Sequence, residues 1–397
     1  MKSFGVEYSS QSPEIRNKMK ETLIINYGVE NVSQIHLKPI LHLLQDQEWW
    51  KQFNSMSEIY ISLREYLSDS NILLRTHQFR PELIGLNSIS IPHQKVINLL
   101  KEHSIEFEIN TKKIINGPLG RPLELDIFIP SHSLGIEING LFWHSELNGK
   151  DSNYHLNKTL QCNEKGIDLI QFWDIEINNK WELISSMILS RLNLSKKIPA
   201  RKCFVNEVPR DQERYFLNEN HIQGYIPSSF SLGLYYSNEL ISLMTFSKPR
   251  YNKKYDLELL RFCSLKGLNI IGGASRLFNH RPEGSIISYS NRRIFNGKMY
   301  EKLGFQKIEE TSPSYYYTND YETLSHRSTF QKHKLNNLLE TFDPSITEWD
   351  NMQLNGFDRV WDCRYGFVGI KIKLKLNMRF NMKLQRNENS SHFFRIY

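Results

Sequence analysis

Long apolar runs are absent from this chain of 397 residues. A helix that crosses a membrane needs about 20 consecutive apolar residues, and no stretch of the sequence approaches that length. The opening residues, MKSFGVEYSS, also lack the apolar core of a secretory signal peptide. The sequence therefore predicts a cytoplasmic protein with no membrane partner.

Cysteine is also scarce. The 4 cysteines are widely scattered and form no CxxC pair: Cys162, Cys203, Cys263 and Cys363. This spacing argues against a structural zinc site and against a disulfide framework. We therefore expect a protein of a reducing compartment.

Positive charge exceeds negative charge, with 50 Lys and Arg against 43 Asp and Glu and a formal net charge of +7. This balance favours a polyanionic partner, although alone it is a weak argument. The length is sufficient for two or three domains, each with its own core.

The segment ELDIFIPSHSLGIEINGLFWH, residues 124–144, is the most informative part of the chain. Two short apolar runs, 123–130 and 134–138, flank a turn-like Ser-His-Ser and predict a β-hairpin. Asp126 lies on the first run, Glu137 on the second, and His144 follows. Two carboxylates on adjacent strands can hold Mg²⁺ or Mn²⁺, and an imidazole beside them can move a proton. The alternative is that both acids are solvated and that His144 caps a polar loop.

Together with YHLNKTLQCNEKGIDLIQFWDIE further along, these motifs resemble the very-short-patch-repair-type branch of the PD-(D/E)xK nucleases, which includes phage homing-type endonucleases. The resemblance covers residues 90–194. It implies cleavage of double-stranded DNA, with Asp126 and Glu137 as metal ligands and His144 as the proton-transfer residue. Asn139 stands where the wider superfamily has a lysine, and His93 where the family tends to carry a helix glutamate.

Residues 151–165 predict a helix that ends before Gly166. His155, Lys158 and Cys162 are three and four residues apart and therefore share one face. That face either turns His155 and Lys158 toward the scissile phosphate, or packs Cys162 in the core and leaves Lys158 to reach outward. Residues 167–173 predict a buried strand, after which Asp174 and Glu176 either complete the site or face solvent.

The N-terminus contains a repeat: FGVEYSSQ at residues 4–11 recurs as YGVENVSQ at 27–34. The repeat resembles the nuclease-associated modular repeats of phage and intron endonucleases, which contact DNA. Arg16, Lys18 and Lys20 are candidate phosphate contacts. The alternative is a small cap packed on the rest of the chain. Residues 41–88 predict a helical linker or a small DNA-binding element.

From residue 199 onward, strand-like segments precede a glycine-rich turn and the motif YEKLGF. Over residues 203–318 this order resembles the GNAT acyltransferase fold, in which Gly272, Gly273 and Ala274 would match the pyrophosphate loop of an acyl-CoA site. Asn269 replaces the family's usual Gln or Arg. After the GNAT-like region come a basic helix-like element at 327–335 and a basic tail. These segments are either solvated or in contact with the DNA backbone, and Lys332 and Lys334 are the candidate DNA contacts.

The predicted fold is α/β: a PD-(D/E)xK-type nuclease core, a mixed sheet flanked by helices, followed by a GNAT-like α+β domain. The predicted divisions are 1–40 (repeats), 41–88 (helical element), 89–196 (nuclease), 197–325 (GNAT-like) and 326–397 (basic extension). The predicted function is a metal-dependent, phage homing-type DNA endonuclease of the host cytoplasm. The alternatives are a DNA-targeted acyltransferase that uses acyl-CoA, and a catalytically inactive DNA-binding protein.

Overall fold

The computed structural model describes residues 90–117, 120–310, 312–362 and 364–370, and parts of 17–83. By their contacts the residues divide between two compact units. Unit 1 draws on Met1–Ser195, Asn291–Asn296 and Ser312–Tyr365, and unit 2 on Lys196–Ser290, Gly297–Thr311 and Gly366–Tyr397. Most of the predicted N-terminal repeats, Arg16 and the basic tail from residue 371 lie outside the described residues.

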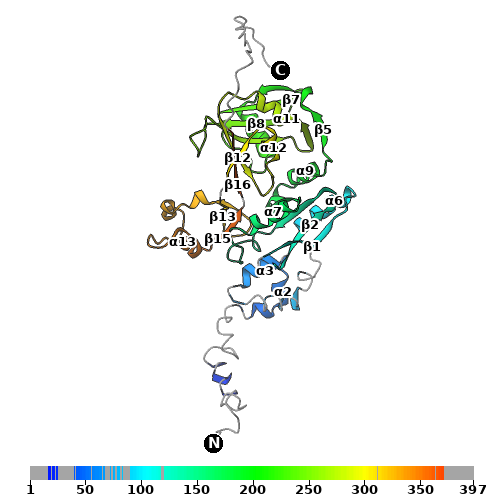
Figure 1. The fold of residues 1–397 in the computed structure, drawn as a ribbon. Coiled ribbons are helices and arrows are strands. Elements are labelled where there is room, and N and C mark those ends of the chain that lie inside the picture. The colour runs from blue at the N-terminus through cyan, green and yellow to red at the C-terminus, as the bar shows by residue number, and fades with distance from the viewer. Residues whose placement is uncertain are drawn as a thin grey trace, which may run out of the picture. The chain divides into compact units, whose positions relative to one another are not determined.

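A four-stranded sheet of order β1-β2-β3-β4 carries the centre of unit 1 (Figure 1). The first two pairings are antiparallel, and β3 runs parallel to β4. The predicted hairpin is confirmed, with Ile127 opposite Ile136. The turn is a short 3₁₀ segment followed by Ser133 in the left-handed region. The bounds are β1 (Glu108–Asn116), β2 (Pro122–Ile129), η6 (Pro130–His132), β3 (Leu134–Asn139) and β4 (Asp168–Trp173).

Four helices accompany this sheet: α6 (Ile91–Glu102), α7 (Tyr154–Glu164), α8 (Asp174–Asn179) and α9 (Trp181–Arg191). The helix predicted over 151–165 is confirmed as α7, and its predicted common face is buried. Cys162 packs with Ile115 and Leu125 of the sheet, which fixes α7 against it. The buried side chains of α7 are His155, Lys158, Thr159 and Cys162.

Unit 1 also contains a three-stranded sheet of order β14-β13-β15. The basic element expected to be helix-like at 327–335 is instead two 3₁₀ segments. They are separated at Gln331, whose backbone is extended. The bounds are η4 (Leu43–Gln45), α2 (Gln47–Trp50), α3 (Met56–Leu63), β13 (Ser314–Thr318), β14 (Ser325–His326), η8 (Arg327–Phe330), η9 (Lys332–Asn337), α13 (Glu348–Leu354) and β15 (Asp358–Asp362).

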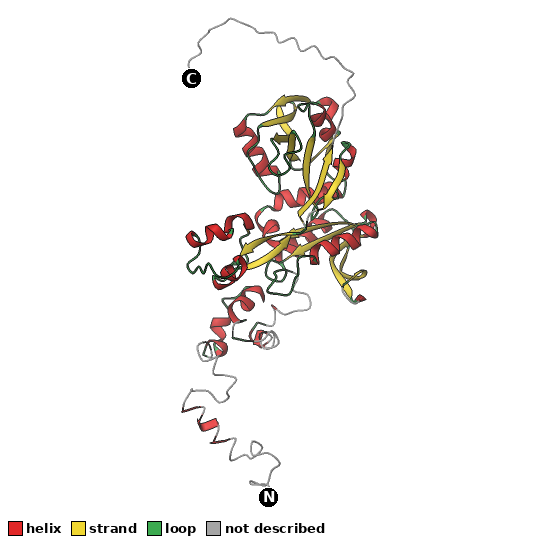
Figure 2. Ribbon diagram, turned by 60° about the vertical axis from the view of Figure 1, so that its left-hand side comes forward, coloured by secondary structure: helices red, strands yellow, loops and turns green. Residues whose placement is uncertain are grey.

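Unit 2 is built on a seven-stranded sheet of order β12-β16-β11-β9-β8-β7-β6, with a separate parallel pair of β10 and β5 (Figure 2). Its bounds are β5 (Lys196–Pro199), η7 (Ala200–Lys202), β6 (Phe204–Glu207), α10 (Arg210–Asn220), β7 (Phe230–Tyr236), β8 (Glu239–Ser247), β9 (Leu257–Ser264), β10 (Leu268–Ile271), α11 (Gly273–Asn279), β11 (Ile286–Asn291), α12 (Lys298–Lys302), β12 (Gln306–Glu310) and β16 (Arg364–Ile370).

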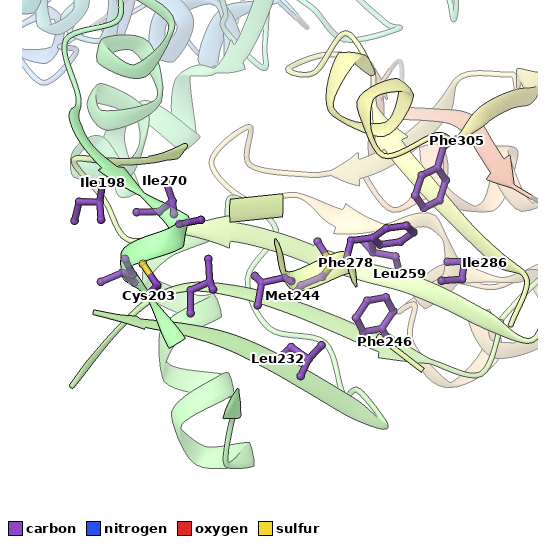
Figure 3. Packing of buried hydrophobic residues seen from close by; sticks show 14 residues of the cluster. Ile198, Cys203, Leu232, Met244, Phe246, Leu259, Ile270, Phe278, Ile286 and Phe305 are labelled. Carbon is purple, nitrogen blue, oxygen red and sulfur yellow. The ribbon is translucent and has the colours of Figure 1, made fainter. Parts of the chain in front are cut away.

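The core of unit 2 lies between this sheet and α11 (Figure 3). Phe246 and Met244 of β8 are fully buried there, and Phe278 of α11 packs against Phe305. Burial of each large apolar side chain contributes about 1.5–3 kcal/mol, so this cluster is a main source of the unit's stability. The chain is thus a mixed α/β protein whose sheets are flanked by helices. No helix in the part of the chain that the structure describes is long and apolar enough to cross a membrane.

Gly233 of β7 sits where side chains from three sides leave no room for a methyl group. An added Cβ would lie 2.4 Å from Leu240 and 2.6 Å from Val208. We expect Gly233→Ala to destabilise unit 2 by about 1–3 kcal/mol, as overpacking of cores does. Hydrogen exchange of β7 and β8 peptides at increasing urea measures the change. The exposed Ser229→Ala serves as control; equal stability of the two variants would contradict the close packing.

Candidate functional site

Asp126 of β2 and Glu137 of β3 lie opposite each other and interlock through the backbone. The Ile138 amide donates to Asp126 Oδ2 at 2.7 Å, and the Asp126 amide donates to Glu137 Oε1 at 3.2 Å. Glu137 is 1% exposed. The predicted convergence of the two carboxylates therefore holds in the structure, because the hairpin register places them at the same level of the sheet.

The ammonium of Lys158, on α7, forms a buried ion pair with Glu137 Oε2. Burial, and then the charge of Asp126, raise the pKa of Glu137, whereas Lys158 lowers it and holds the carboxylate as one half of an ion pair. Burial lowers the pKa of Lys158, but the negative charge of Glu137 outweighs it and the net shift is upward. The lysine thus stays charged and is the buried counter-ion of the carboxylate pair. The alternative interpretation, in which Lys158 reaches outward to solvent, is therefore wrong.

His93 contacts the site from α6. Its Nε2 lies 3.2 Å from Asp126 Oδ2. Asp174, at the start of α8, accepts from the Leu141 and Ile175 amides through Oδ1. Burial raises the pKa of Asp174 to about 6, against the effect of these hydrogen bonds. Asp174 therefore holds the turn that follows β3.

Asn139, Gln171 and His155 form a buried polar network on β3, β4 and α7. Asn139 Nδ2 donates to Gln171 Oε1 at 3.2 Å, and His155 Nδ1 lies 3.1 Å from the same oxygen. Burial lowers the pKa of His155 to about 3 despite its contact with Gln171, so the ring is neutral. Within the described residues, Asn139 Oδ1 and His155 Nε2 are buried without a hydrogen-bond partner.

His144 follows the turn after β3, and its ring stacks on His155 with centroids 5.0 Å apart. Its Nδ1 is buried and has no partner among the described residues. Burial, and then the electrostatic effects of His155 and of the Lys158 ammonium, hold the pKa of His144 well below its usual range. The imidazole is therefore a neutral group that stacks on His155, in the state that can accept a proton.

The donor set fits one hard divalent cation held by few protein ligands. Mg²⁺ usually takes one or two carboxylates and keeps several waters. Among the described residues, Asp126 makes its contacts with the Ile138 amide and with His93 through Oδ2. Each oxygen of an ionised carboxylate has two lone pairs, so Oδ1 can bind a cation. In the described part of the chain, no three His, Cys, Asp or Glu side chains gather as a metal cluster. Asp126 and Glu137 are thus the residues that could hold Mg²⁺ or Mn²⁺.

The other predicted site residues lie elsewhere. Lys332 and Lys334 are exposed on η9, where Lys334 donates to the Ser328 carbonyl. Lys18 and Lys20 are exposed on a helical stretch near the N-terminus. Gly272, Gly273 and Ala274 lie in unit 2, at the start of α11.

Gly273 has a packing role: an added Cβ would lie 2.9 Å from Ile270 Cγ2. A glycine is therefore required there for α11 to approach β10.

Two residues of the site were missed at the level of sequence. Gln171 is a polar residue inside the apolar run 167–173, and that interruption was a usable signal. Arg293 donates to the Gln171 carbonyl from 122 positions further along the chain. No local pattern could have revealed it, because the contact depends on the tertiary fold.

No protein-family model matches the chain, and no curated protein matches it. Among solved structures, the chain is similar to the homing endonuclease I-Bth0305I catalytic domain at 21% identity. The alignment covers 26% of this chain and 95% of that chain, with a TM-score of 0.21. At this TM-score the likeness does not establish a shared fold.

We expect Lys158→Met to destabilise unit 1 by about 3–5 kcal/mol, because a buried carboxylate loses its counter-ion. The double variant Glu137→Gln/Lys158→Met removes both charges and should recover most of this loss. Urea unfolding followed by tryptophan fluorescence measures both, since all 7 tryptophans lie in unit 1. Equal losses in the single and double variants would refute the ion pair as the cause.

His155 should make the protein acid-sensitive. Burial lowers the pKa of His155 to about 3 in the folded state, so its neutral form contributes fully to the free energy of unfolding above the unfolded pKa of about 6.5. This contribution is lost as pH falls toward the folded pKa, at about 1.4 kcal/mol per pH unit. Between pH 7 and 5 we expect the free energy of unfolding of His155→Gln to fall by about 2 kcal/mol less than that of the wild type. Parallel urea curves at the two pH values test this, and identical losses would contradict a buried neutral ring.

Proposed function

We propose that the chain is a metal-dependent endonuclease that hydrolyses phosphodiester bonds of double-stranded DNA. The observation that carries this proposal is the interlocked pair of Asp126 and Glu137, with Lys158 and two neutral histidines beside it. Carboxylates that hold a divalent cation, a fixed positive charge and a proton acceptor are the parts that this hydrolysis needs.

Each part has a distinct task. Asp126 and Glu137 would hold a divalent ion, and such an ion would supply positive charge against the phosphate and make water more acidic. Lys158 keeps Glu137 oriented and compensates its charge. His144 accepts a proton at Nε2, since its Nδ1 is the buried ring nitrogen. His93 holds Asp126 from the helix side.

Duplex DNA as the partner is supported by the formal net charge of +7. Phosphate contacts give affinity and register without reading the sequence. The exposed Lys18, Lys20, Lys332 and Lys334 are candidates for such contacts. A phage origin and a homing-type role remain part of the proposal, on the strength of the motifs in residues 90–194 and the N-terminal repeat.

The acyltransferase alternative gains no support from a specific contact. The glycine-rich turn precedes a helix of only 7 residues, Gly273–Asn279. Gly273 is accounted for by its packing on Ile270. Acyl-CoA is therefore not proposed as a cofactor.

Incubation with supercoiled plasmid and phage genomic DNA in Mg²⁺, Mn²⁺ or EDTA tests the proposal. We expect nicked or linear products that require the metal and that disappear in Asp126→Asn. Glu124→Gln, a change in a half-exposed acid on the same strand paired with Lys112, should cleave as the wild type does. Cleavage by Asp126→Asn would overturn the site. Tight DNA binding without any metal-dependent cleavage would identify a catalytically inactive binding protein.

The lysines of η9 give a separate prediction. Removal of one lysine–phosphate interaction should reduce the slope of log K against log salt by about 0.9. We therefore expect Lys332→Gln/Lys334→Gln to reduce the slope by up to about 2 on any duplex sequence. Lys51→Gln, an exposed lysine paired with Glu48, is the control. Fluorescence anisotropy in EDTA across salt concentrations measures the slopes, and an unchanged slope in the double variant removes η9 from the interface.

A further inference from the structure

Gln171 is fully buried in β4, and its amide orientation is determined by its neighbours. Its Nε2 donates to the His155 carbonyl at 3.0 Å and to Thr159 Oγ1 at 2.7 Å. A carbonyl oxygen can only accept, so the amide nitrogen must be on that side. The amide oxygen must then face Asn139 Nδ2 and His155 Nδ1.

This orientation determines where His155 carries its proton. The Gln171 oxygen accepts and cannot donate, so His155 Nδ1, 3.1 Å away, must be the donor. In a neutral imidazole the other nitrogen then holds a lone pair. Nε2 is buried and has no partner among the described residues, while the residue is only 2% exposed. A buried acceptor left unmatched is unfavourable, so this nitrogen calls for an O–H donor at the site.

Arg293 fixes the backbone of Gln171 from the open side of the sheet. β4 is an edge strand, and its outward backbone groups at Gln171 both bond Arg293. The Gln171 amide donates to the Arg293 carbonyl at 2.8 Å, and Arg293 Nη1 donates to the Gln171 carbonyl at 2.7 Å. The covering residue thus replaces a missing neighbour strand at this position.

The guanidinium is itself held on several sides. It makes two hydrogen bonds to Glu176, at 2.5 and 2.6 Å. Its Nε lies 3.6 Å from Asp362 Oδ1, and its Cζ lies 5.7 Å from the centre of the Trp173 ring. Arg293 is 1% exposed, and a planar guanidinium bound in two directions is a rigid anchor.

We infer that Gln171 and Arg293 are positioning residues that hold His155 as its Nδ1–H tautomer, with the Nε2 lone pair presented to a water molecule of the site. This inference rests on the proposed nuclease function for its catalytic meaning, because His155 lies one helical turn before Lys158, which pairs with Glu137. Its structural content, the position of one proton, stands independently of cleavage. Removal of the hydrogen-bond partners that orient a metal-binding imidazole typically changes activity about 10–100-fold, and we expect an effect of the same order for His155.

Nitrogen NMR of the full chain labelled at its 13 histidines reads the tautomer directly. The His155 signals are those that disappear in His155→Gln. In the wild type we expect a protonated Nδ1 and an unprotonated Nε2. Gln171→Met removes the acceptor and should release the ring to the other tautomer, whereas Gln171→Glu retains an acceptor oxygen and should keep the proton at Nδ1. Gln161→Met, the same substitution at a position of α7 outside this network, should change nothing.

Arg293→Met alone leaves Glu176 without its partner, so the informative variant is Arg293→Met/Glu176→Gln. With unfolding checked by tryptophan fluorescence, we expect this variant to show a mixture of tautomers.

In Mg²⁺, Gln171→Met should cleave DNA about 10–100-fold more slowly, with unchanged DNA affinity in EDTA. A protonated Nε2 in the wild type would overturn the inference. A Gln171→Met variant that keeps the proton on Nδ1 and cleaves DNA at the full rate would also overturn it. A wild type that never cleaves DNA removes the proposed function, while the ring spectra still decide the tautomer.

Discussion

The structure of unit 1 depends on a carboxylate buried at the centre of a sheet. Glu137 has almost no access to water, and an ionised group in that position requires a counter-charge and hydrogen bonds. Lys158 supplies the charge, and the Asp126 amide supplies one hydrogen bond. Since Lys158 lies on α7, the ion pair fixes where this helix crosses the sheet. His155, one turn earlier on α7, is brought to the Gln171 amide as a consequence.

The free edge of β4 is the second constraint. An edge strand leaves backbone donors and acceptors unpaired, and here a segment of six residues, Asn291–Asn296, returns to unit 1 to cover it. Arg293 bonds the strand through its main chain and its side chain, and its charge meets Glu176 and Asp362. Covering the edge and orienting the polar network are therefore one arrangement, which joins three segments distant in sequence.

The polar groups of the site are set in surroundings that keep both histidines neutral. Burial lowers the pKa of His155 to about 3 and also holds that of His144 below its usual range. Nearby cations act in the same direction, so both rings carry lone pairs at neutral pH. A site with fixed positive charge, paired carboxylates and neutral imidazoles is organised before any substrate arrives, and such preorganisation is what electrostatic catalysis requires.

Local sequence patterns determined the hairpin, helix α7 and the buried strand β4. Each arises from the period of its own apolar residues and from turn residues at its ends. They also identified Asp126, Glu137, Asn139, His155 and Lys158 as neighbours, because hairpin register and helical spacing are local geometry. Only the tertiary structure placed His93 on Asp126, oriented Gln171 and brought in Arg293. The last of these contacts spans 122 positions, and such partners are selected by packing of whole elements, which no local period encodes. The division of residues 327–335 into two 3₁₀ segments is likewise a feature of the tertiary structure, with Gln331 extended between them. The local sequence pattern alone favoured one helix-like element.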